Sequence, residues 1–233
     1  LNIYADVYED SINALRNSFS RLVLNIKGNY YVRFKDPEFQ RLVVAKWSTD
    51  GVGVTQAQLD KVTVFPYGVC NENTIIEDLS DFGEKFPNVV EIEGSAFEYC
   101  TGLTSIGVPV NKHITIKKNA FIGTSLNERG IDLLWISVGD RAFCYCKFVN
   151  LFIPNTVNFD SGTNHWASNN LLVRAELEEG HSLIPQDICT NCTSLKTFVI
   201  PSTVNTIRQS ILHGCNAIKY IICKAITPPR LDN

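Results

Sequence analysis

The side chains best suited to chemistry in this chain are its cysteines, eight among 233 residues. Two short pairs, Cys144-x-Cys146 and Cys189-x-x-Cys192, have spacings at which thiolates bind zinc, and a C-x-x-C pair can also cycle between dithiol and disulfide. Neither chemistry fits its surroundings. No βαβ pattern encloses the C-x-x-C pair, and Cys146 and Cys192 both belong to a longer-range pattern. We therefore expect no metal site and no redox centre.

No other set of residues assembles an active site. The four histidines are scattered over the chain, and we expect each to be solvated in a loop: His113, His165, His181 and His213. The sequence holds neither a nucleophile elbow G-x-S-x-G nor a phosphate-binding G-x-x-x-x-G-K. The acidic run at 176–179 is typical of a solvated face. We predict a protein without catalytic residues or cofactors.

The cysteines instead mark an internal repeat. Cys100, Cys146, Cys192 and Cys215 are separated by 46, 46 and 23 residues. Apolar residues recur eight positions before these cysteines and three positions after them: Ile92, Val138, Ile184 and Ile207 before, and Leu103, Val149, Leu195 and Ile218 after. An Ala-Phe pair recurs at 96–97, 120–121 and 142–143, and in the second of these copies Thr124 replaces the cysteine.

A degenerate copy fills the gap between Cys146 and Cys192, marked by Phe159, Trp166 and Leu172. Six copies then cover roughly 92–230, after a shorter, weaker one at 86–92. One such unit cannot bury its own apolar face, so units of this kind stack into a solenoid with continuous columns of equivalent side chains. A free cysteine suits such a column because it packs as a small hydrophobe with a weak donor. We expect the four column cysteines to be reduced and buried.

These units resemble the BspA-type leucine-rich repeat, whose pattern runs roughly I-x-x-x-A-F-x-x-C-x-x-L-x-x-I-x-I-P. The closing segment 221–231 also resembles the ends of such arrays in gut Bacteroidetes proteins. The resemblance implies an α+β protein: a leucine-rich-repeat solenoid of about six to seven repeats of ~23 residues with short parallel strands, behind an N-terminal helical cap. We place the cap at 1–75 and the repeat array at 76–233.

The cap is expected to be helical and to cover the apolar end of the array. Residues 11–26 carry apolar residues at helical spacing, which predicts a helix packed on the first repeats or, alternatively, a partner-binding helix. In related Bacteroidetes proteins a segment similar to half of an EF hand precedes the repeats; the matching residues here are Ser48, Asp50, Val52, Gly53 and, at the closing position, Gln58. Calcium needs several oxygen ligands and a closing carboxylate. We therefore predict a degenerate loop in which Gly51 and Gly53 form a turn between two helices.

Composition excludes several classes of partner. The chain is 45% hydrophobic and 19% charged, as ordinary globular proteins are, and its net charge is −3 with a pI near 5.8. Nucleic-acid binding calls for a basic stripe, so we expect no nucleic-acid partner. No apolar run approaches a membrane span. Because the sequence begins at Leu1, we expect a processed or trimmed chain whose targeting segment is not included.

The outward side chains of the repeat strands are the predicted ligand site. Strands are expected at 103–108, 149–153, 172–177, 195–200 and 218–223. Alternate side chains of each strand face outward, and stacked parallel strands build one extended face. Exposed aromatic residues bordered by charges are typical of binding patches. The predicted site residues are Phe152, Arg174, Glu176, Val199, Tyr220 and Ile222.

We therefore expect a non-enzymatic recognition module that binds a protein ligand. The resemblance implies a secreted or surface-anchored protein, such as a lipoprotein, that adheres to host matrix glycoproteins. The alternative is a carbohydrate-binding accessory protein that stacks sugars on Trp135, Trp166 or Tyr220. A third hypothesis is an enzyme or redox protein that uses the cysteine pairs. We expect a monomer, because the prolines at 228–229 limit strand pairing with another chain.

Overall fold

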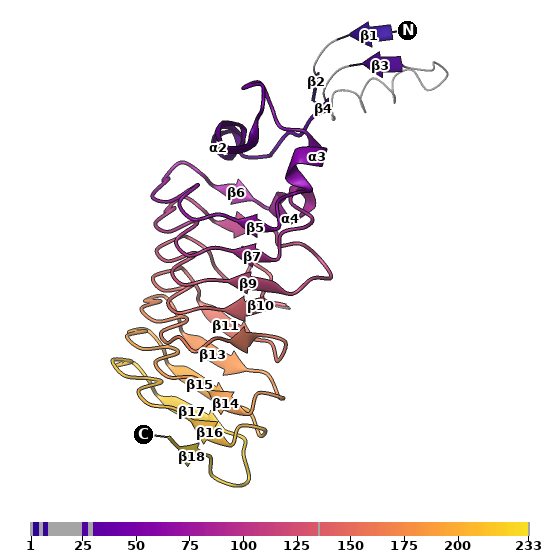
Figure 1. Cartoon of the computed structure of the whole chain (residues 1–233). Helices are drawn as coiled ribbons and strands as arrows, with labels where there is room; N and C mark the ends of the chain where they lie inside the picture. The colour runs from indigo at the N-terminus through magenta and orange to yellow at the C-terminus, as the bar shows by residue number, and fades with distance from the viewer. Residues whose placement is uncertain (1, 5–6, 9–24, 28–29, 135, 233) are drawn as a thin grey trace.

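The computed structural model describes residues 2–4, 7–8, 25–27, 30–134 and 136–232. Most of these residues form an elongated solenoid of short stacked strands (Figure 1). Helix α2 (Pro37–Trp47) lies at one end of the solenoid, and strand β18 (Arg230–Leu231) lies at the other (Figure 1). The predicted solenoid architecture is confirmed.

Two stacks of strands run along the solenoid. The first stack holds the strands that open each repeat: β5 (Val64–Phe65), β7 (Glu91–Ile92), β9 (Ile114–Ile116), β10 (Ile136–Val138) and β12 (Asn158–Phe159), followed by β14 (Leu183–Ile184), β16 (Thr206–Ile207) and β18. The second stack holds the strands after each turn: β6 (Asp78–Leu79) and β8 (Ser105–Ile106), then β11 (Asn150–Ile153), β13 (Arg174–Leu177), β15 (Thr197–Ile200) and β17 (Tyr220–Cys223). All strand pairs in the two stacks are parallel. The last five strands of the second stack, from β8 to β17, lie within the strand segments predicted from the sequence.

The turns between the two stacks form a third hydrogen-bonded layer. Backbone N–H groups of one turn donate to carbonyls of the next, as from Phe97 to Ala120 at 2.9 Å and from Phe121 to Ala142 at 3.0 Å. Each turn contains residues with positive φ, and the first of these positions forms a column of seven: Gly68, Ser95, Asn119, Arg141, Asn164, Asp187 and Ser210. Seven stacked turns agree with the predicted six to seven repeats.

Aromatic rings stack along the core. Successive ring centroids lie 5.2 Å apart for Phe97 and Phe121, 5.6 Å for Phe121 and Phe143, and 5.5 Å for Phe143 and Trp166. The planes of neighbouring rings are within 11° of parallel, as expected for side chains at equivalent positions of stacked turns. Phe65 extends this ring ladder toward the cap, 5.0 Å from Phe97. The ladder ties each repeat to its neighbours by burying large apolar surfaces.

The cysteine column binds the repeats to one another through its thiols. In four copies the thiol donates to the carbonyl of the residue at the phenylalanine position of the preceding repeat: Cys100 to Cys70, Cys146 to Phe121, Cys192 to Trp166 and Cys215 to Cys189, at 2.9, 3.3, 3.4 and 3.1 Å. In the degenerate copy Asn169 takes the cysteine position, and its Nδ2 donates to the Phe143 carbonyl at 2.9 Å. The column therefore selects a small side chain with a donor. All eight cysteines are free and seven are buried.

Helix α2 closes the N-terminal end of the array. Asp36 accepts the Phe39 N–H at 2.9 Å as its N-cap, and the buried Phe39 ring lies 6.1 Å from Phe65. One apolar core runs without a break from Val32 in the cap to Cys215 in the last turn. Two short helices, α3 (Gln56–Leu59) and α4 (Phe82–Lys85), follow. The cap boundary at residue 75 stays a prediction.

Before helix α2, four short strands form two parallel pairs: β1 (Asn2–Tyr4) with β3 (Asn25–Lys27), and β2 (Val7–Tyr8) with β4 (Tyr30–Tyr31). The helix predicted over 11–26 lies outside the described residues, apart from 25–26, which belong to β3. The structure therefore places a strand at the end of that predicted helix. Pairing of β3 with β1 supplies the backbone hydrogen bonds that a helix would otherwise make within itself.

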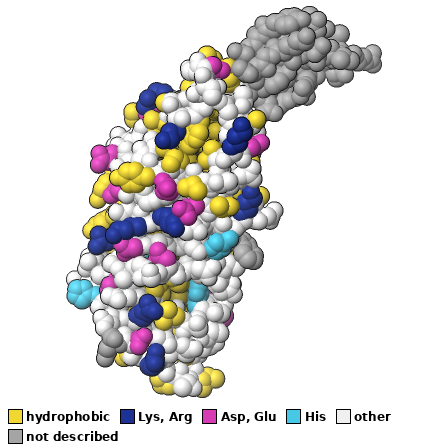
Figure 2. Space-filling view, in the orientation of Figure 1, with side chains coloured by type: hydrophobic (Ala, Val, Ile, Leu, Met, Phe, Trp, Pro, Cys, Tyr) yellow, Lys and Arg dark blue, Asp and Glu magenta, His cyan; other side chains and the backbone are white. Residues whose placement is uncertain are grey.

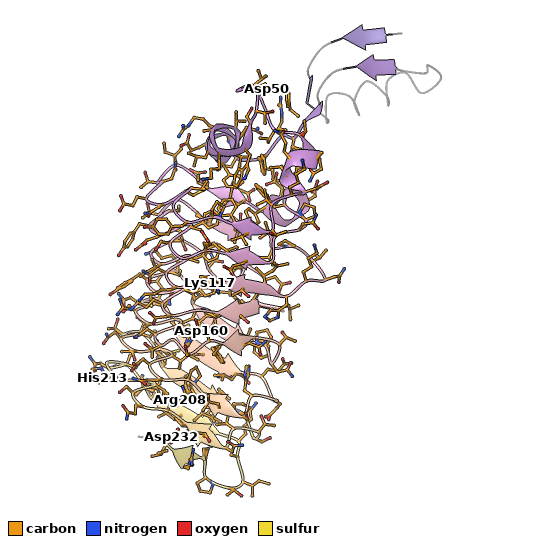
Figure 3. The ribbon with its side chains drawn as sticks, viewed as in Figure 1. Asp50, Lys117, Asp160, Arg208, His213 and Asp232 are labelled. Carbon is orange, nitrogen blue, oxygen red and sulfur yellow. The ribbon has the colours of Figure 1, made fainter. Side chains whose placement is uncertain are left out.

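The loop between α2 and α3 is the predicted turn, and it is held together by Asp50 (Figure 3). The Asp50 carboxylate accepts hydrogen bonds from the Tyr31 hydroxyl at 2.6 Å, the Ser48 hydroxyl at 2.9 Å and the Val52 N–H at 2.8 Å. These donors lower the pKa of Asp50, the Tyr31 hydroxyl most of all. Gln58, at the closing position of the EF-hand pattern, caps α3 through the Thr55 N–H at 2.7 Å. The residues that match the calcium-loop pattern thus make hydrogen bonds that hold this loop and the start of α3.

Candidate functional site

The outer side of β11, β13, β15 and β17 is the surface on which the predicted site residues fall, and we call it the strand face. Register aligns its side chains in two columns: Asn150, Arg174, Thr197 and Tyr220 in one, and Phe152, Glu176, Val199 and Ile222 in the other. Neighbouring strands lie about 4.8 Å apart, so β11 and β17 are about 14 Å apart. Every predicted site residue therefore belongs to one sheet.

The apolar residues of the strand face lie at its two ends. Phe152 on β11 is 51% exposed, and Tyr220 and Ile222 on β17 are 63% and 44% exposed. Phe152 and Ile222 share a column but are separated by two strands. The structure thus brings Tyr220 and Ile222 together and holds Phe152 apart from them, so the face carries two apolar spots.

Charged side chains occupy the middle of the strand face. Arg174 donates to Glu176 Oε2 at 2.6 Å, and Lys224 Nζ lies 3.2 Å from Glu176 Oε1. Both cations lower the pKa of Glu176, chiefly through the hydrogen bond from Arg174. Glu176 therefore stays ionised between its two partners. Lys224 was missed by the sequence analysis, although it follows Ile222 by two residues and alternation places it on the same face.

Val199 was predicted to face a ligand, and that prediction is wrong. It points outward from β15, yet it is only 1% exposed. Register places Val199 between Glu176 on β13 and Ile222 on β17. The ion pair between Lys224 and Glu176 bridges across β15, so the long lysine side chain covers the valine. Val199 supports the charged network from below and is removed from the candidate site.

The two described aromatic residues of the carbohydrate hypothesis, Trp166 and Tyr220, do not form a platform. Trp166 was predicted as a stacking surface, but it is fully buried because it occupies the phenylalanine position of its repeat and stacks on Phe143. Trp135 lies outside the described residues. Tyr220 alone among the three is described as exposed, at 63%.

Burial holds four of the thiols in the protonated form, whereas a hydrogen bond with Cys189 lowers the pKa of Cys192. Burial raises the pKa of Cys100, Cys144 and Cys146 to about 12 and that of Cys215 to about 11. A thiol in that range stays protonated at neutral pH and is a poor nucleophile and metal ligand. Within the described part of the chain, no three histidine, cysteine or carboxylate side chains are placed to hold a metal ion.

Two of the four histidines are buried, contrary to the prediction that all are solvated. His165 is 0% exposed because it takes the alanine position that precedes the ring ladder in other repeats, as at Ala142. Burial lowers its pKa, although Asp160 Oδ1 lies 3.6 Å away and opposes the shift. His181 is 8% exposed, and its Nε2 lies 2.9 Å from the Pro154 carbonyl. His113 and His213 are exposed, as predicted.

The outer side of the first stack differs from the strand face. Charged residues of alternating sign occupy equivalent positions directly after four of its strands: Lys117, Asp160, Arg208 and Asp232 (Figure 3). The space-filling view likewise shows basic and acidic side chains interspersed along the molecule (Figure 2). Mixed charges of this kind are typical of a solvated surface. The strand face, with apolar spots around an ion network, is the stronger candidate for ligand binding.

Comparison with known proteins agrees with this architecture. A family model described as BspA type leucine rich repeat region matches residues 86–223 in six copies. A leucine-rich repeat protein from Bacteroides ovatus ATCC 8483 is 22% identical, with 69% of this chain and 40% of that chain covered and a TM-score of 0.54. A leucine rich cell surface protein from Faecalibacterium prausnitzii A2-165 is 17% identical, with 59% and 58% covered and a TM-score of 0.32.

This chain thus spans less than two thirds of either solved protein. No curated protein matches its sequence. Among the described residues, no helix has the length and apolar character needed to cross a membrane. The family model covers more than half of the chain, and its copies coincide with the stacked repeats. The chain therefore belongs to the BspA-type leucine-rich repeat family.

Proposed function

We propose that this protein is a non-enzymatic recognition module, secreted or held at the cell surface, that binds a protein ligand through the strand face. The observation that carries the proposal is the half-exposed trio Phe152, Tyr220 and Ile222 on one rigid sheet. Aromatic side chains of this kind are frequent anchors of protein interfaces. Membership of the family supports this location, and a host matrix glycoprotein is the ligand we propose.

The layout of the strand face suits a protein surface better than a sugar. Its two apolar spots are about 14 Å apart, farther than one sugar ring extends. Between them, Arg174, Glu176 and Lys224 offer charges of both signs. A protein ligand with two apolar contacts around a polar centre would match this layout, and the ion network would fix its orientation.

Binding to immobilised matrix glycoproteins, to their deglycosylated forms and to free glycans tests the proposal. We expect saturable binding to a glycoprotein that survives deglycosylation. The double variant Phe152→Ala/Tyr220→Ala should weaken it at least about tenfold, since buried aromatic anchors dominate interface energies. A matched control, Tyr67→Ala/Val110→Ala, removes a similar exposed apolar surface (Tyr67 65%, Val110 81%) elsewhere and should bind as the wild type does.

Other outcomes would reject parts of the proposal. Equal loss in both double variants would mean that the strand face has no special role. Binding to free glycans, together with loss of binding to the glycoprotein when that glycoprotein is deglycosylated, would favour the carbohydrate-binding alternative, in which Tyr220 is the stacking residue. Absence of binding to every immobilised glycoprotein would reject the matrix ligand while leaving the fold untouched.

A further inference from the structure

The second strand stack is interrupted in the middle of the molecule. Strand β8 pairs with β6 and β11 pairs with β13, but residues 126–134 form no strand between them. This segment lies against β8, where the Ile106 N–H donates to the Gly130 carbonyl at 2.7 Å. A Cβ on Gly130 would lie 2.0 Å from the Thr104 carbonyl oxygen, so only glycine allows this approach. The segment is thus fixed to the β8 side of the gap.

On the β11 side, the described hydrogen bonds of the same segment lie only at its start. The Lys147 N–H donates to the Leu126 carbonyl at 2.8 Å. Two residues later the Val149 N–H donates to Glu128 Oε2 at 3.0 Å. A carboxylate therefore stands in for the missing strand carbonyl at Val149, and the two segments separate from there onward.

Among the described residues, none pairs with the edge of β11 that faces this gap. Arg174 at the start of β13 and Glu178 just after it donate their N–H groups toward β11, to the carbonyls of Val149 and Ile153 at 3.4 and 2.9 Å. Register makes Asn150 the equivalent of Arg174 and Phe152 the equivalent of Glu176. The N–H groups of Asn150 and Phe152 must therefore point into the gap, where no described residue accepts a hydrogen bond from either.

A hollow of about 520 Å³ lies along this edge. Its walls are the 128–133 segment on one side and β11 with Pro154 on the other. Ile131 and Leu133 are nearly buried and give it an apolar lining, while Phe152 is half-exposed. Arg129 is the one cation among its lining residues, is exposed, and lies in no ion pair within the described part of the chain.

We propose that this hollow binds an extended peptide segment of a partner protein, which adds to β11 as a further strand. A peptide backbone supplies the carbonyls and N–H groups that the edge lacks, as in other cases of strand addition. Strand β11 has four residues, which a peptide of about four residues would match at ~3.3 Å per residue. A carboxylate on the peptide would pair with Arg129. The site uses the edge of β11, whereas the strand face uses its outward side, and the two share Asn150 and Phe152.

Selection of a displayed library of random heptapeptides on the folded wild-type chain tests the proposal. We expect enriched peptides to carry an acidic residue and to bind with measurable Kd. Asn150→Ala keeps the edge N–H and should bind as the wild type does. Asn150→Pro removes that N–H, at a position where an edge strand tolerates proline, and should weaken binding at least about tenfold. Arg129→Glu should weaken peptides that carry the acidic residue.

Two further measurements separate this site from the strand face and from a folding defect. Tyr220→Ala should leave peptide affinity unchanged, whereas loss of binding there would assign the peptide to the strand face. Bound peptide should slow amide hydrogen exchange at Asn150 and Phe152 in the wild-type chain, whatever the stability of the proline variant. Equal affinity for wild type and a folded Asn150→Pro, unprotected amides at both positions, or the absence of any enriched peptide would overturn the proposal.

Discussion

The two ends of the solenoid differ in how they cover the inward-facing side chains of their terminal strands. At the N-terminal end, Phe65 begins the ring ladder and is fully buried beneath Phe39 of α2. At the other end, Ile221 on β17 lies in the same inward column as Phe198 on β15. Phe198 is 0% exposed, whereas Ile221 is 58% exposed. Phe65 and Ile221 both lie on the inward side of a terminal strand, but they have different neighbours.

This contrast shows that burial in the array is a property of neighbouring repeats. Each repeat covers the one before it, so a side chain is buried by the next unit or by a cap. The free edge of β11 follows the same rule, because the repeat that should precede it there has no second strand. Interaction surfaces of this fold therefore arise where a neighbour is missing as well as where side chains point outward.

The largest effect is expected from removing the main ring of the cap. Phe39→Ala should lower the free energy of unfolding by about 3–5 kcal/mol, the usual cost of truncating a buried phenylalanine. Phe39 touches the rings of Phe34, Phe65, Phe82 and Phe86, and none of them can fill the space alone. Ile221→Ala should cost less than about 1 kcal/mol, because the side chain is more than half exposed. Urea denaturation of both variants measures the difference.

A folded baseline is needed for that comparison. Both variants should keep the wild-type circular dichroism spectrum at low temperature before denaturant is added. Equal destabilisation by Phe39→Ala and Ile221→Ala would contradict the contrast, since it would mean that Ile221 is covered in solution. If the wild type has the molecular mass of a dimer in solution and Ile221→Ala has that of a monomer, a second copy of the chain covers Ile221.

A smaller effect is expected from loosening the cap without removing apolar surface. Asp36 accepts the Phe39 N–H at 2.9 Å and, through its other oxygen, the Glu77 N–H at 2.8 Å. Asp36→Ala should cost about 1–2 kcal/mol, as the loss of a helix N-cap does. Asp36→Asn keeps a capping oxygen and should recover most of this. Thermal unfolding ranks the three chains, and an alanine variant as stable as the wild type would show that α2 is held by its rings alone.

The regular parts of this fold could be predicted from the sequence because repetition states the same information several times. The Cys100 and Cys146 column, the Ala-Phe pairs and the strand segments each recur at fixed offsets, and the structure stacks them as expected. The two helices around Asp50 were also predicted, because glycines mark the turn between them.

The departures could not be predicted, because each depends on a partner far away in the sequence. Val199 alternates outward as predicted, but Lys224 from the next strand covers it. His165 is buried because it replaces an alanine, which becomes visible only when the degenerate copy is aligned with Ala142. The gap beside β11 depends on Gly130 lying against Thr104. Contacts between residues so far apart in the sequence cannot be predicted from a local sequence pattern.

The smallest expected effect is a pH dependence of stability that arises at the N-terminal end, which α2 covers. Glu38 on α2 accepts hydrogen bonds from Arg41 at 2.7 Å and from Asn73 in the first turn at 2.7 Å, and so it joins the cap to the array. These bonds, that of Arg41 first, lower the pKa of Glu38 to about 2. In the unfolded chain its pKa is about 4.3, so the unfolded state binds the proton more tightly. The stabilisation from Glu38 is therefore complete above about pH 5 and is lost as the pH falls toward 2.

Glu38→Gln should be less stable than the wild type at pH 6 and equal to it near pH 2, in urea denaturation at both pH values. Arg41→Ala should shrink the same pH dependence, because it removes the main cause of the shift. A constant gap between wild type and Glu38→Gln across this range would show that Glu38 stabilises the cap through packing, without its charge.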